Sequence, residues 1–307
     1  MKKLSIVVPV YYNAQSLPLL FEELLLVENE LSKKSIEMEL IFVDDGSGDE
    51  SWQVLLDIKR KREGTRLVKL TRNFGSVHAL KIGFKFVTGD CFMALAADLQ
   101  DPPELIVKMA EKWLRGVKFV ICERAGREDP PVTKLFASIY YKLLRFFVMR
   151  DFPRGGFDLA LMDQAMLPYL QNSAKNINTL LFAYWLGFKP DVMQYTRRER
   201  VHGKSRWTLA KKITLFLDSI LGFSIIPIRL MSLIGIVVAT VSMGYGFLII
   251  INVFLGNAEV RGFATIVTLI TFLLGLVIFM LGVIGEYVWR SFDEVNRRPE
   301  AVIDEVY

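Results

Sequence analysis

Residues 1–125 alternate between short apolar runs and segments whose apolar residues recur at helical spacing. A bounded apolar run is typical of a buried strand, and spacing of three and four residues is typical of an amphipathic helix. The alternation predicts an α/β fold, a mainly parallel sheet with helices on both faces. The predicted strands are Leu4–Val10, Met38–Val43, Arg66–Leu70, Cys91–Ala97 and Lys118–Cys122, and the predicted helices lie near Leu17–Leu31, Glu50–Glu63, Val77–Val87 and Pro103–Leu114.

Residues 126–200 follow this pattern less regularly. They contain a basic helical segment over Thr133–Arg150, a turn at Gly155-Gly156, a short apolar run over Phe157–Met162 and a candidate strand over Asp191–Thr196. The chain shows no internal repeat, and we assign residues 1–204 to one domain.

Two segments near the C-terminus, Met231–Leu255 and Ala264–Val288, are long and apolar. About 20 such residues suffice for a helix to cross a bilayer. A buried core helix is rarely so long or so free of charge, so we predict two transmembrane helices, joined as a hairpin, over residues 230–289. The charged residues in this range are Glu259, Arg261 and Glu286.

Lysine and arginine gather on both sides of the predicted hairpin. The positive-inside rule therefore places both termini, and the domain at residues 1–204, in the cytoplasm. Residues 290–307 form a cytoplasmic tail. The basic residues are Arg197, Arg198, Arg200, Lys204, Arg206, Lys211, Lys212 and Arg229 before the hairpin, and Arg290, Arg297 and Arg298 after it.

The segment Trp207–Ile226 mixes apolar, aromatic and basic residues directly before the first predicted span. This mixture predicts an amphipathic helix that lies in the membrane interface, within a juxtamembrane region at residues 205–229. A linker helix packed on the domain is the alternative interpretation.

The chain has 307 residues, 52% of them hydrophobic, and a net charge of +5. Its two cysteines, Cys91 and Cys122, lie in apolar runs, which favours buried, reduced thiols over a disulfide or a metal pair. With two histidines in all, a histidine-based zinc site is disfavoured. The first strand is not followed by a G-x-G-x-x-G loop, and no Walker motif occurs, so a dinucleotide dehydrogenase and a P-loop NTPase fit poorly.

Acidic residues follow two of the predicted strands. Asp98, Gln100 and Asp101 come after the fourth strand, at the sheet edge where open α/β sheets bind ligands. Their oxygens suit a hard divalent cation that holds a diphosphate, although a capped turn explains them equally well. Asp44 and Asp45 end the second strand, where a carboxylate can bind a ribose hydroxyl or a base N–H. The alternative there is a turn in which Asp49 or Ser47 caps the next helix.

Arginines follow the third and fifth strands. Arg72 can neutralise a phosphate, and Arg124 with Arg127 suits bidentate phosphate recognition. Surface turns and solvated basic loops are the alternatives. The densest cationic stretch, residues 195–206, is either a polybasic patch beside anionic lipid or a diphosphate-binding segment.

Six short motifs occur in an order that is shared with a known family. The chain resembles the GT-A-fold glycosyltransferases of family two that act on polyprenyl phosphates, and it looks most like the GtrB-type bactoprenol glucosyltransferases. The dolichyl-phosphate mannose synthases are more distant relatives. The motifs are Val8-Pro9-Val10-Tyr11, Val43-Asp44-Asp45-Gly46-Ser47, Arg72-Asn73-Phe74-Gly75, Asp98-Leu99-Gln100-Asp101-Pro102-Pro103, Gly155-Gly156-Phe157-Asp158 and Gly203-Lys204-Ser205.

The resemblance implies transfer of a hexose, with UDP-glucose as the expected donor, to undecaprenyl phosphate at the cytoplasmic face of the bacterial inner membrane. It implies Mg²⁺ or Mn²⁺ bound by Asp98 and Gln100, and Asp158, Arg124 and Arg127 as catalytic residues, Asp158 as base or sugar-orienting carboxylate. The residues expected to bind the nucleotide sugar are Pro9, Tyr11, Asp44, Asp45, Arg72 and Asp98. Those expected to bind the acceptor and diphosphate are Arg124, Arg127, Arg200, Lys204 and Ser205.

Two departures from the family pattern bear on these expectations. Many relatives carry Asp two residues before the Asp98 position, where this chain has Ala96, so water or phosphate oxygens must complete the metal shell. An acidic residue often follows the first-strand Tyr-Asn, where this chain has Ala14. A phosphate monoester acceptor is largely dianionic at neutral pH, because its second pKa is about 6. We therefore expect a single displacement with inversion, for which a strong general base is not required.

Three rival functions remain. The same reaction with mannose, GlcNAc or aminoarabinose is the first. A processive polysaccharide synthase is disfavoured, because such enzymes carry more spans and a Gln-x-x-Arg-Trp motif. An inactive membrane scaffold or lipid-binding protein is the third, suggested by Ala96. The expected partners are the nucleotide sugar, the polyprenyl phosphate and the bilayer, with no nucleic acid; glycine-rich spans also permit a homo-oligomer.

Overall fold

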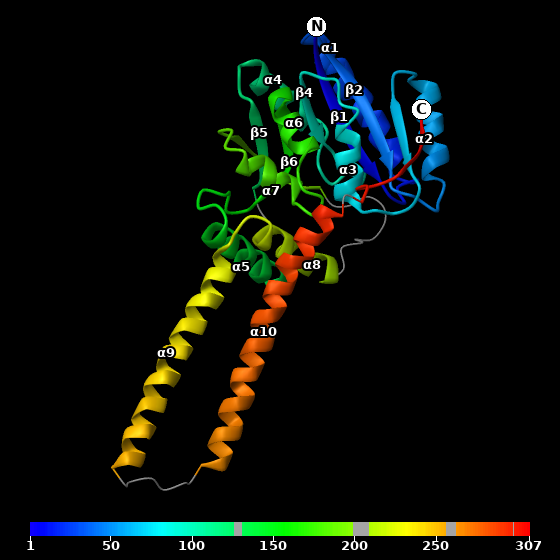
Figure 1. The fold of residues 1–307 in the computed structure, drawn as a ribbon. Coiled ribbons are helices and arrows are strands. Elements are labelled where there is room, and N and C mark those ends of the chain that lie inside the picture. Colours follow the sequence, from blue (N-terminus) through cyan, green and yellow to red (C-terminus); the bar gives the residue numbers. More distant parts are fainter. Residues whose placement is uncertain (126–130, 199–208, 256–261, 297) are drawn as a thin grey trace. The chain divides into compact units, whose positions relative to one another are not determined.

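The computed structural model describes residues 1–125, 131–198, 209–255, 262–296 and 298–307. The chain divides into two compact units, one of Met1–Ser219 with Pro299–Tyr307 and one of Ile220–Arg298. All strands among the described residues belong to the first unit, and the two long C-terminal helices belong to the second (Figure 1).

Eight strands of the described chain form one sheet, in the order β7-β5-β6-β4-β1-β2-β3-β8. β1 pairs in parallel with β2 and β4, β2 with β3, and β5 with β7. β6 runs antiparallel to β4 and β5, and β8 runs antiparallel to β3. The strands are β1 (Lys2–Val10), β2 (Ile36–Asp44), β3 (Arg66–Leu70), β4 (Cys91–Ala94), β5 (Phe119–Arg124), β6 (Phe157–Asp163), β7 (Asp191–Tyr195) and β8 (Ile303–Val306).

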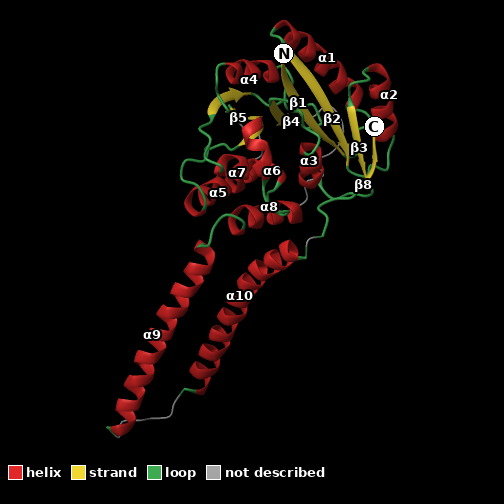
Figure 2. Cartoon of the chain, turned by 45° about the horizontal axis from the view of Figure 1, so that its top comes forward, coloured by secondary structure: helices red, strands yellow, loops and turns green. Residues whose placement is uncertain are grey.

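Helices cover both faces of this sheet, which confirms the predicted fold class (Figure 2). On one face, Leu4, Ile6 and Val8 of β1 share a buried core with α1, α2 and α4. On the other face, α3 packs so closely that a Cβ on Gly83 would lie 2.3 Å from a Val7 methyl carbon. The α-helices of this unit are α1 (Leu17–Lys33), α2 (Ser51–Lys61), α3 (Ser76–Phe84), α4 (Leu105–Leu114), α5 (Pro131–Phe147), α6 (Leu167–Gln171), α7 (Thr179–Trp185) and α8 (Leu209–Leu221) up to Ser219.

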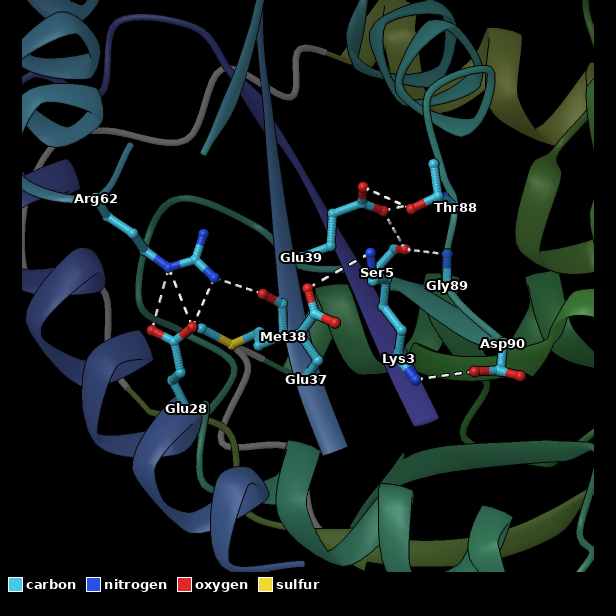
Figure 3. Close-up of polar contacts among 10 residues, drawn as sticks. All are labelled: Lys3, Ser5, Glu28, Glu37, Met38, Glu39, Arg62, Thr88, Gly89 and Asp90. Carbon is cyan, nitrogen blue, oxygen red and sulfur yellow. Dashed lines mark hydrogen bonds and ion pairs between the residues drawn. The ribbon is translucent and has the colours of Figure 1, made fainter. Parts of the chain in front are cut away.

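The amino ends of β1 and β2 are closed by a polar network (Figure 3). Ser5 donates to the Glu39 carboxylate at 2.5 Å and accepts from the Gly89 amide at 2.9 Å. Thr88 also donates to Glu39, at 2.8 Å. Buried polar groups are stable only when they are paired in this way. The network fastens the loop before β4 to β1 and β2.

The tail returns to the sheet as β8, a strand that was not predicted from the sequence. β8 pairs with the outer edge of β3, and the backbones of Leu67 and Tyr307 exchange two hydrogen bonds of 2.9 Å. The Lys69 ammonium lies 3.3 Å from the Glu305 carboxylate, and the Tyr307 ring meets Trp52 edge-on. Residues 299–307 therefore belong to the sheet unit.

The second unit consists mainly of α9 (Ile226–Phe254) and α10 (Phe263–Val295). The segments Ile226–Ile249 and Leu269–Val295 are long and apolar enough to cross a membrane. The two apolar helices that the sequence predicted are thus present in the structure, although α9 begins five residues before its predicted start and α10 ends seven residues after its predicted end.

Candidate active site

A cavity of about 830 Å³ lies at the carboxyl ends of β1, β2 and β4. This volume is in the range of small-molecule and cofactor sites, and the position is the ligand-binding edge of open α/β sheets. Loops after β1, β2, β3 and β4 line it, together with a loop before α7 and one face of α8. The lining segments are Pro9–Ser16, Asp45, Asp49, Glu50, Asn73–His78, Ala96–Asp98, Lys175–Asn178, Thr214, Leu215 and Asp218.

The Asp45 carboxylate holds the cavity wall formed by the loop after β3. It accepts hydrogen bonds from the Phe74 amide at 2.7 Å and the Gly75 amide at 2.9 Å. Gly46 makes this approach possible, because it has φ +66° and a Cβ there would lie 2.5 Å from the Arg72 carbonyl carbon. Burial raises the pKa of Asp45, and the two amides counter that rise.

Asparagine at position 45 is expected to loosen this wall. Its side-chain amide offers one acceptor and presents a donor to the second backbone N–H, which costs about 2 kcal/mol of unfolding free energy. We expect the KM for the donor to rise about tenfold. Chemical denaturation and transfer kinetics of the full-length protein measure both quantities. Glu63→Gln, an exposed carboxylate change, is the control, and a donor KM that stays at the wild-type value would contradict the prediction.

Asp44 and Arg72, two predicted donor-binding residues, do not line the cavity. Asp44 is fully buried and accepts from the Ser47 amide at 3.2 Å, and burial raises its pKa. Neighbouring strand residues point to opposite faces, so one member of the pair Asp44-Asp45 must turn away from the other. The Arg72 guanidinium lies 4.1 Å from the centre of the Phe74 ring, outside the lining.

The chain turns sharply after β4 and brings Asp98 to the cavity. Leu99 has φ 60°, a left-handed backbone that a non-glycine residue adopts only at a cost of about 1–3 kcal/mol. The Ser16 hydroxyl holds Ala97, the residue before Asp98, by donating to its carbonyl at 2.7 Å. Tyr12, another lining residue, has φ 57°. Such strain is concentrated at functional sites, and nothing in the residue pattern could have revealed it.

A second polar group gathers where β5 and β7 end and β6 begins. Because β6 is antiparallel to β5, its first residues share an edge with the last residues of β5. The Arg124 guanidinium donates to the Asp158 carboxylate. Tyr195 donates to Asp101 at 2.7 Å and lies 3.3 Å from Asp158. Arg197 lies 3.4 Å from Asp101.

The charges of this second group balance one another. Burial raises the pKa of Asp101, and Arg197 and the Tyr195 hydroxyl offset only part of that rise. Burial would lower the pKa of Arg124, but the Asp158 carboxylate outweighs it and raises that pKa. Tyr195 and Arg197 were not assigned a role individually, although both lie in the cationic stretch 195–206 that was a candidate diphosphate-binding segment. The position of Tyr195 at the end of a predicted strand was the available signal.

The remaining predicted site residues are placed as follows. Pro9, Tyr11, Asp45 and Asp98 line the cavity. Gln100 lies two residues beyond Asp98, and its backbone N–H donates to the Asp98 carboxylate at 3.3 Å. Its carbonyl accepts from the Arg198 amide at 2.9 Å. Arg127, Arg200, Lys204 and Ser205 lie outside the described residues.

The helix α8 forms part of the cavity wall. Its Ser219 hydroxyl accepts from Tyr140 of α5 at 3.0 Å and from the Asn178 side chain at 3.2 Å. Asn178 also caps α7 through the Leu181 amide. This face of α8 therefore packs on the sheet unit, as in the alternative interpretation of the segment, whereas Ile213 is exposed.

Within the described ranges, no three His, Cys, Asp or Glu side chains gather closely enough to hold a metal ion. Asp98 reaches the cavity, and Ala96 beside it offers no oxygen ligand from its side chain. Mg²⁺ is commonly bound through one or two carboxylates together with substrate phosphates. The side chains present therefore fit a cation that is shared with a diphosphate. Cys91 and Cys122 are buried free thiols, as predicted, and burial raises the pKa of Cys122 to about 12.

Comparison with known proteins gives a consistent assignment. The model of glycosyl transferase family 2 matches residues 5–174, more than half of the chain. A prophage bactoprenol glucosyl transferase homolog of Escherichia coli is 33% identical over 99% of this chain and 99% of its own length. The bactoprenol glucosyl transferase of Shigella phage SfX is 32% identical over 98% of both chains. An uncharacterized glycosyltransferase of Synechocystis is 32% identical over 99% of this chain and 96% of its own.

Among solved structures, a mannosyltransferase from Pyrobaculum calidifontis in complex with GDP-Man and Mn²⁺ has a TM-score of 0.49 at 19% identity, covering 71% of this chain and 63% of its own. The family match and the full-length similarity, both found for a chain whose cavity lies at the carboxyl edge of an α/β sheet, lead to one assignment. The chain belongs to glycosyl transferase family 2 and is a glycosyltransferase, as the order of its sequence motifs predicted.

Proposed function

We propose that the protein transfers glucose from UDP-glucose to undecaprenyl phosphate at the cytoplasmic face of a bacterial inner membrane. The observation that carries this proposal is the cavity that presents Asp98 at the end of β4 in a chain that also holds two apolar helices. Relatives that are similar over nearly the whole chain are named bactoprenol glucosyl transferases, which supports the lipid acceptor and the sugar.

The donor would occupy the cavity. Pro9 and Tyr11 would line the nucleoside, and Asp45 would act by holding the neighbouring loop, through Phe74 and Gly75. Asp98, with Gln100, would hold Mg²⁺ or Mn²⁺ against the diphosphate. When bound, the cation neutralises charge on the leaving diphosphate.

The acceptor phosphate would approach from the second polar group. Arg124 would bind this dianion, together with Arg127, Arg200, Lys204 and Ser205, which lie outside the described residues. Asp158 fixes the Arg124 guanidinium through its hydrogen bond, so the cation is already oriented before the acceptor arrives. One phosphate oxygen then attacks the anomeric carbon as the bond to the nucleoside diphosphate breaks, with inversion of configuration.

The membrane helices would hold this chemistry at the bilayer. The distribution of Lys and Arg supports α9 and α10 as spans with both termini in the cytoplasm. Glycines in both helices permit close helix contact, which supports self-association into a homo-oligomer.

Transfer of radiolabelled sugar to undecaprenyl phosphate tests the proposal. Purified full-length protein is incubated with UDP-glucose, GDP-mannose, UDP-GlcNAc or UDP-aminoarabinose in turn. We expect UDP-glucose to be the preferred donor and the product to be the β-linked glucosyl phosphate. Preference for another donor would replace the sugar assignment, an α-linked product would contradict the single displacement, and no transfer from any donor would favour an inactive scaffold.

A further inference from the structure

A buried ionic group stands behind the cavity wall, formed by His78, Lys81 and Glu300. The Glu300 carboxylate lies 2.7 Å from the Lys81 ammonium and 3.2 Å from His78 Nδ1. The Lys81 side chain is 1% exposed, that of Glu300 11% and that of His78 23%. His78 lines the cavity, and the other two residues do not. The group thus runs from the interior to the ligand-facing surface.

Three segments that are distant in sequence meet at this group. His78 and Lys81 belong to α3, and Glu300 belongs to the tail, three residues before β8. The Lys81 ammonium also donates to the carbonyls of Ser173 and Ala174, at 3.0 and 3.1 Å. The residues that follow, Lys175–Asn178, line the cavity. Lys81 is therefore fully engaged with the protein interior, and the cavity-facing member of the group is His78.

The pairing sets the orientation of the His78 ring. Nδ1 is directed to Glu300, so Nε2 is the ring nitrogen that remains to meet a ligand. Glu300 is charged at neutral pH: burial opposes its ionisation, but hydrogen bonds from His78 and Lys81 outweigh burial and lower its pKa. Both nitrogens of an imidazolium ring donate hydrogen bonds, so a ring that gives Nδ1–H to Glu300 presents Nε2–H in one fixed direction.

The surroundings of His78 favour an anion. The amino end of α3, at Ser76 and Val77, lies in the same cavity wall and carries the positive end of the helix dipole. Lys175 lies in the lining as well. The lining carboxylates Asp49, Glu50, Asp98 and Asp218 belong to other segments, and the Asp45 carboxylate is already bound by two backbone amides.

We propose that His78 binds a phosphate oxygen of the donor nucleotide and that Glu300 is the positioning residue that aims the His78 ring. This inference rests on the proposed use of the cavity for a nucleotide sugar. It assigns a donor-binding role to a tail residue that follows both apolar helices in the chain.

The tail contains its own control. Glu305 lies in β8 and pairs with Lys69 at 3.3 Å, outside the cavity lining. Both glutamates attach the tail to the sheet unit, but Glu300 alone of the two contacts a cavity residue. If the role of Glu300 were purely structural, Glu300→Gln and Glu305→Gln would both lower the melting temperature, and neither would change the donor KM.

The experiment compares four full-length variants, Glu300→Gln, His78→Phe, the double variant and Glu305→Gln, in transfer kinetics and in UDP titration by calorimetry. We expect Glu300→Gln and His78→Phe each to raise the donor KM and the UDP dissociation constant about tenfold, with kcat changed less than about twofold. Because Glu300 acts through His78, the double variant should match His78→Phe and not multiply the two effects. Glu305→Gln should match the wild type.

Three competitors locate the contact. UMP and UDP should lose affinity for the variants to a similar extent, whereas uridine should inhibit wild type and variants alike. Equal loss for uridine, multiplicative effects in the double variant, or a Glu305→Gln effect equal to that of Glu300→Gln would each overturn the proposal. If Glu300→Gln does not fold, His78→Phe decides, since unchanged UDP affinity in that variant is contradictory by itself.

Failure of the proposed function gives a different pattern. A wild-type protein that binds UDP but transfers no sugar contradicts the transfer reaction, and the UDP affinities of the variants still decide the role of His78. A wild-type protein that binds no nucleotide overturns both.

Discussion

Asparagine in place of Asp98 is expected to lower kcat/KM for sugar transfer by roughly a hundred- to a thousandfold. The chain after β4 presents the Asp98 carboxylate to the cavity, and Ala96 carries no oxygen in its side chain, so the proposed cation depends on Asp98. Asparagine keeps the shape of the side chain and can still accept the hydrogen bond from the Gln100 backbone N–H, but it removes the negative charge. The loss should therefore fall on cation binding and on the departure of the diphosphate.

The matched measurement is turnover with and without EDTA, followed by titration with Mg²⁺ and Mn²⁺. Wild-type activity should fall in EDTA to the level of Asp98→Asn, and added cation should restore the wild type far more than the variant. Asp57→Asn, an exposed carboxylate on α2, should behave as the wild type. Unchanged turnover both in EDTA and in Asp98→Asn would refute the metal assignment.

Glutamine in place of Arg124 is expected to lower kcat/KM for undecaprenyl phosphate by about a hundredfold, with little change in the KM for UDP-glucose. The substitution removes a cation that would hold the acceptor and leaves the Asp158 carboxylate without that partner, near Tyr195 and Asp101. Two carboxylates then stand close to the site of an incoming dianion, which adds repulsion to the lost attraction.

Initial rates over a range of acceptor concentrations measure this effect. Arg115→Gln, which removes an exposed cation just after α4, is the control and should leave the rates unchanged. Asp158→Asn should also weaken acceptor use, because Arg124 loses its fixed orientation. A variant whose donor KM rises while acceptor kinetics stay intact would place Arg124 on the donor side and contradict the assignment.

The sequence predicted the elements whose contacts are local. The strands from β1 to β5 and the helices between them were predicted from apolar runs and helical spacing, because the pattern of each element can be recognised within about ten residues. β4 ends at Ala94, three residues before the predicted end, since its last residues turn away to reach the cavity. β8 was missed, because Ile303–Val306 is short and its identity as a strand depends on the unpaired edge of β3, far away in sequence.

The candidate site was predictable to the level of segments. Every motif after β1, β2, β3 and β4 contributes at least one residue to the cavity lining. Which member of Asp44-Asp45 reaches the lining depends on side-chain alternation and on the turn at Gly46, which apolar patterning does not fix. Tertiary contacts determine the left-handed conformations of Tyr12 and Leu99 and the pairing of Glu300 with His78. The local sequence pattern therefore could not predict them.

The pairing of β8 with β3 constrains how the polypeptide is made. A ribosome releases residues 303–306 only after it has synthesised α9 and α10, so the edge of β3 stays unpaired until the hairpin exists. If α9 and α10 cross a bilayer, β8 can reach β3 only when the chain crosses an even number of times. In that case completion of the sheet would depend on membrane topology: a chain that inserted one helix alone would leave its tail on the far side of the bilayer and the edge of β3 unpaired.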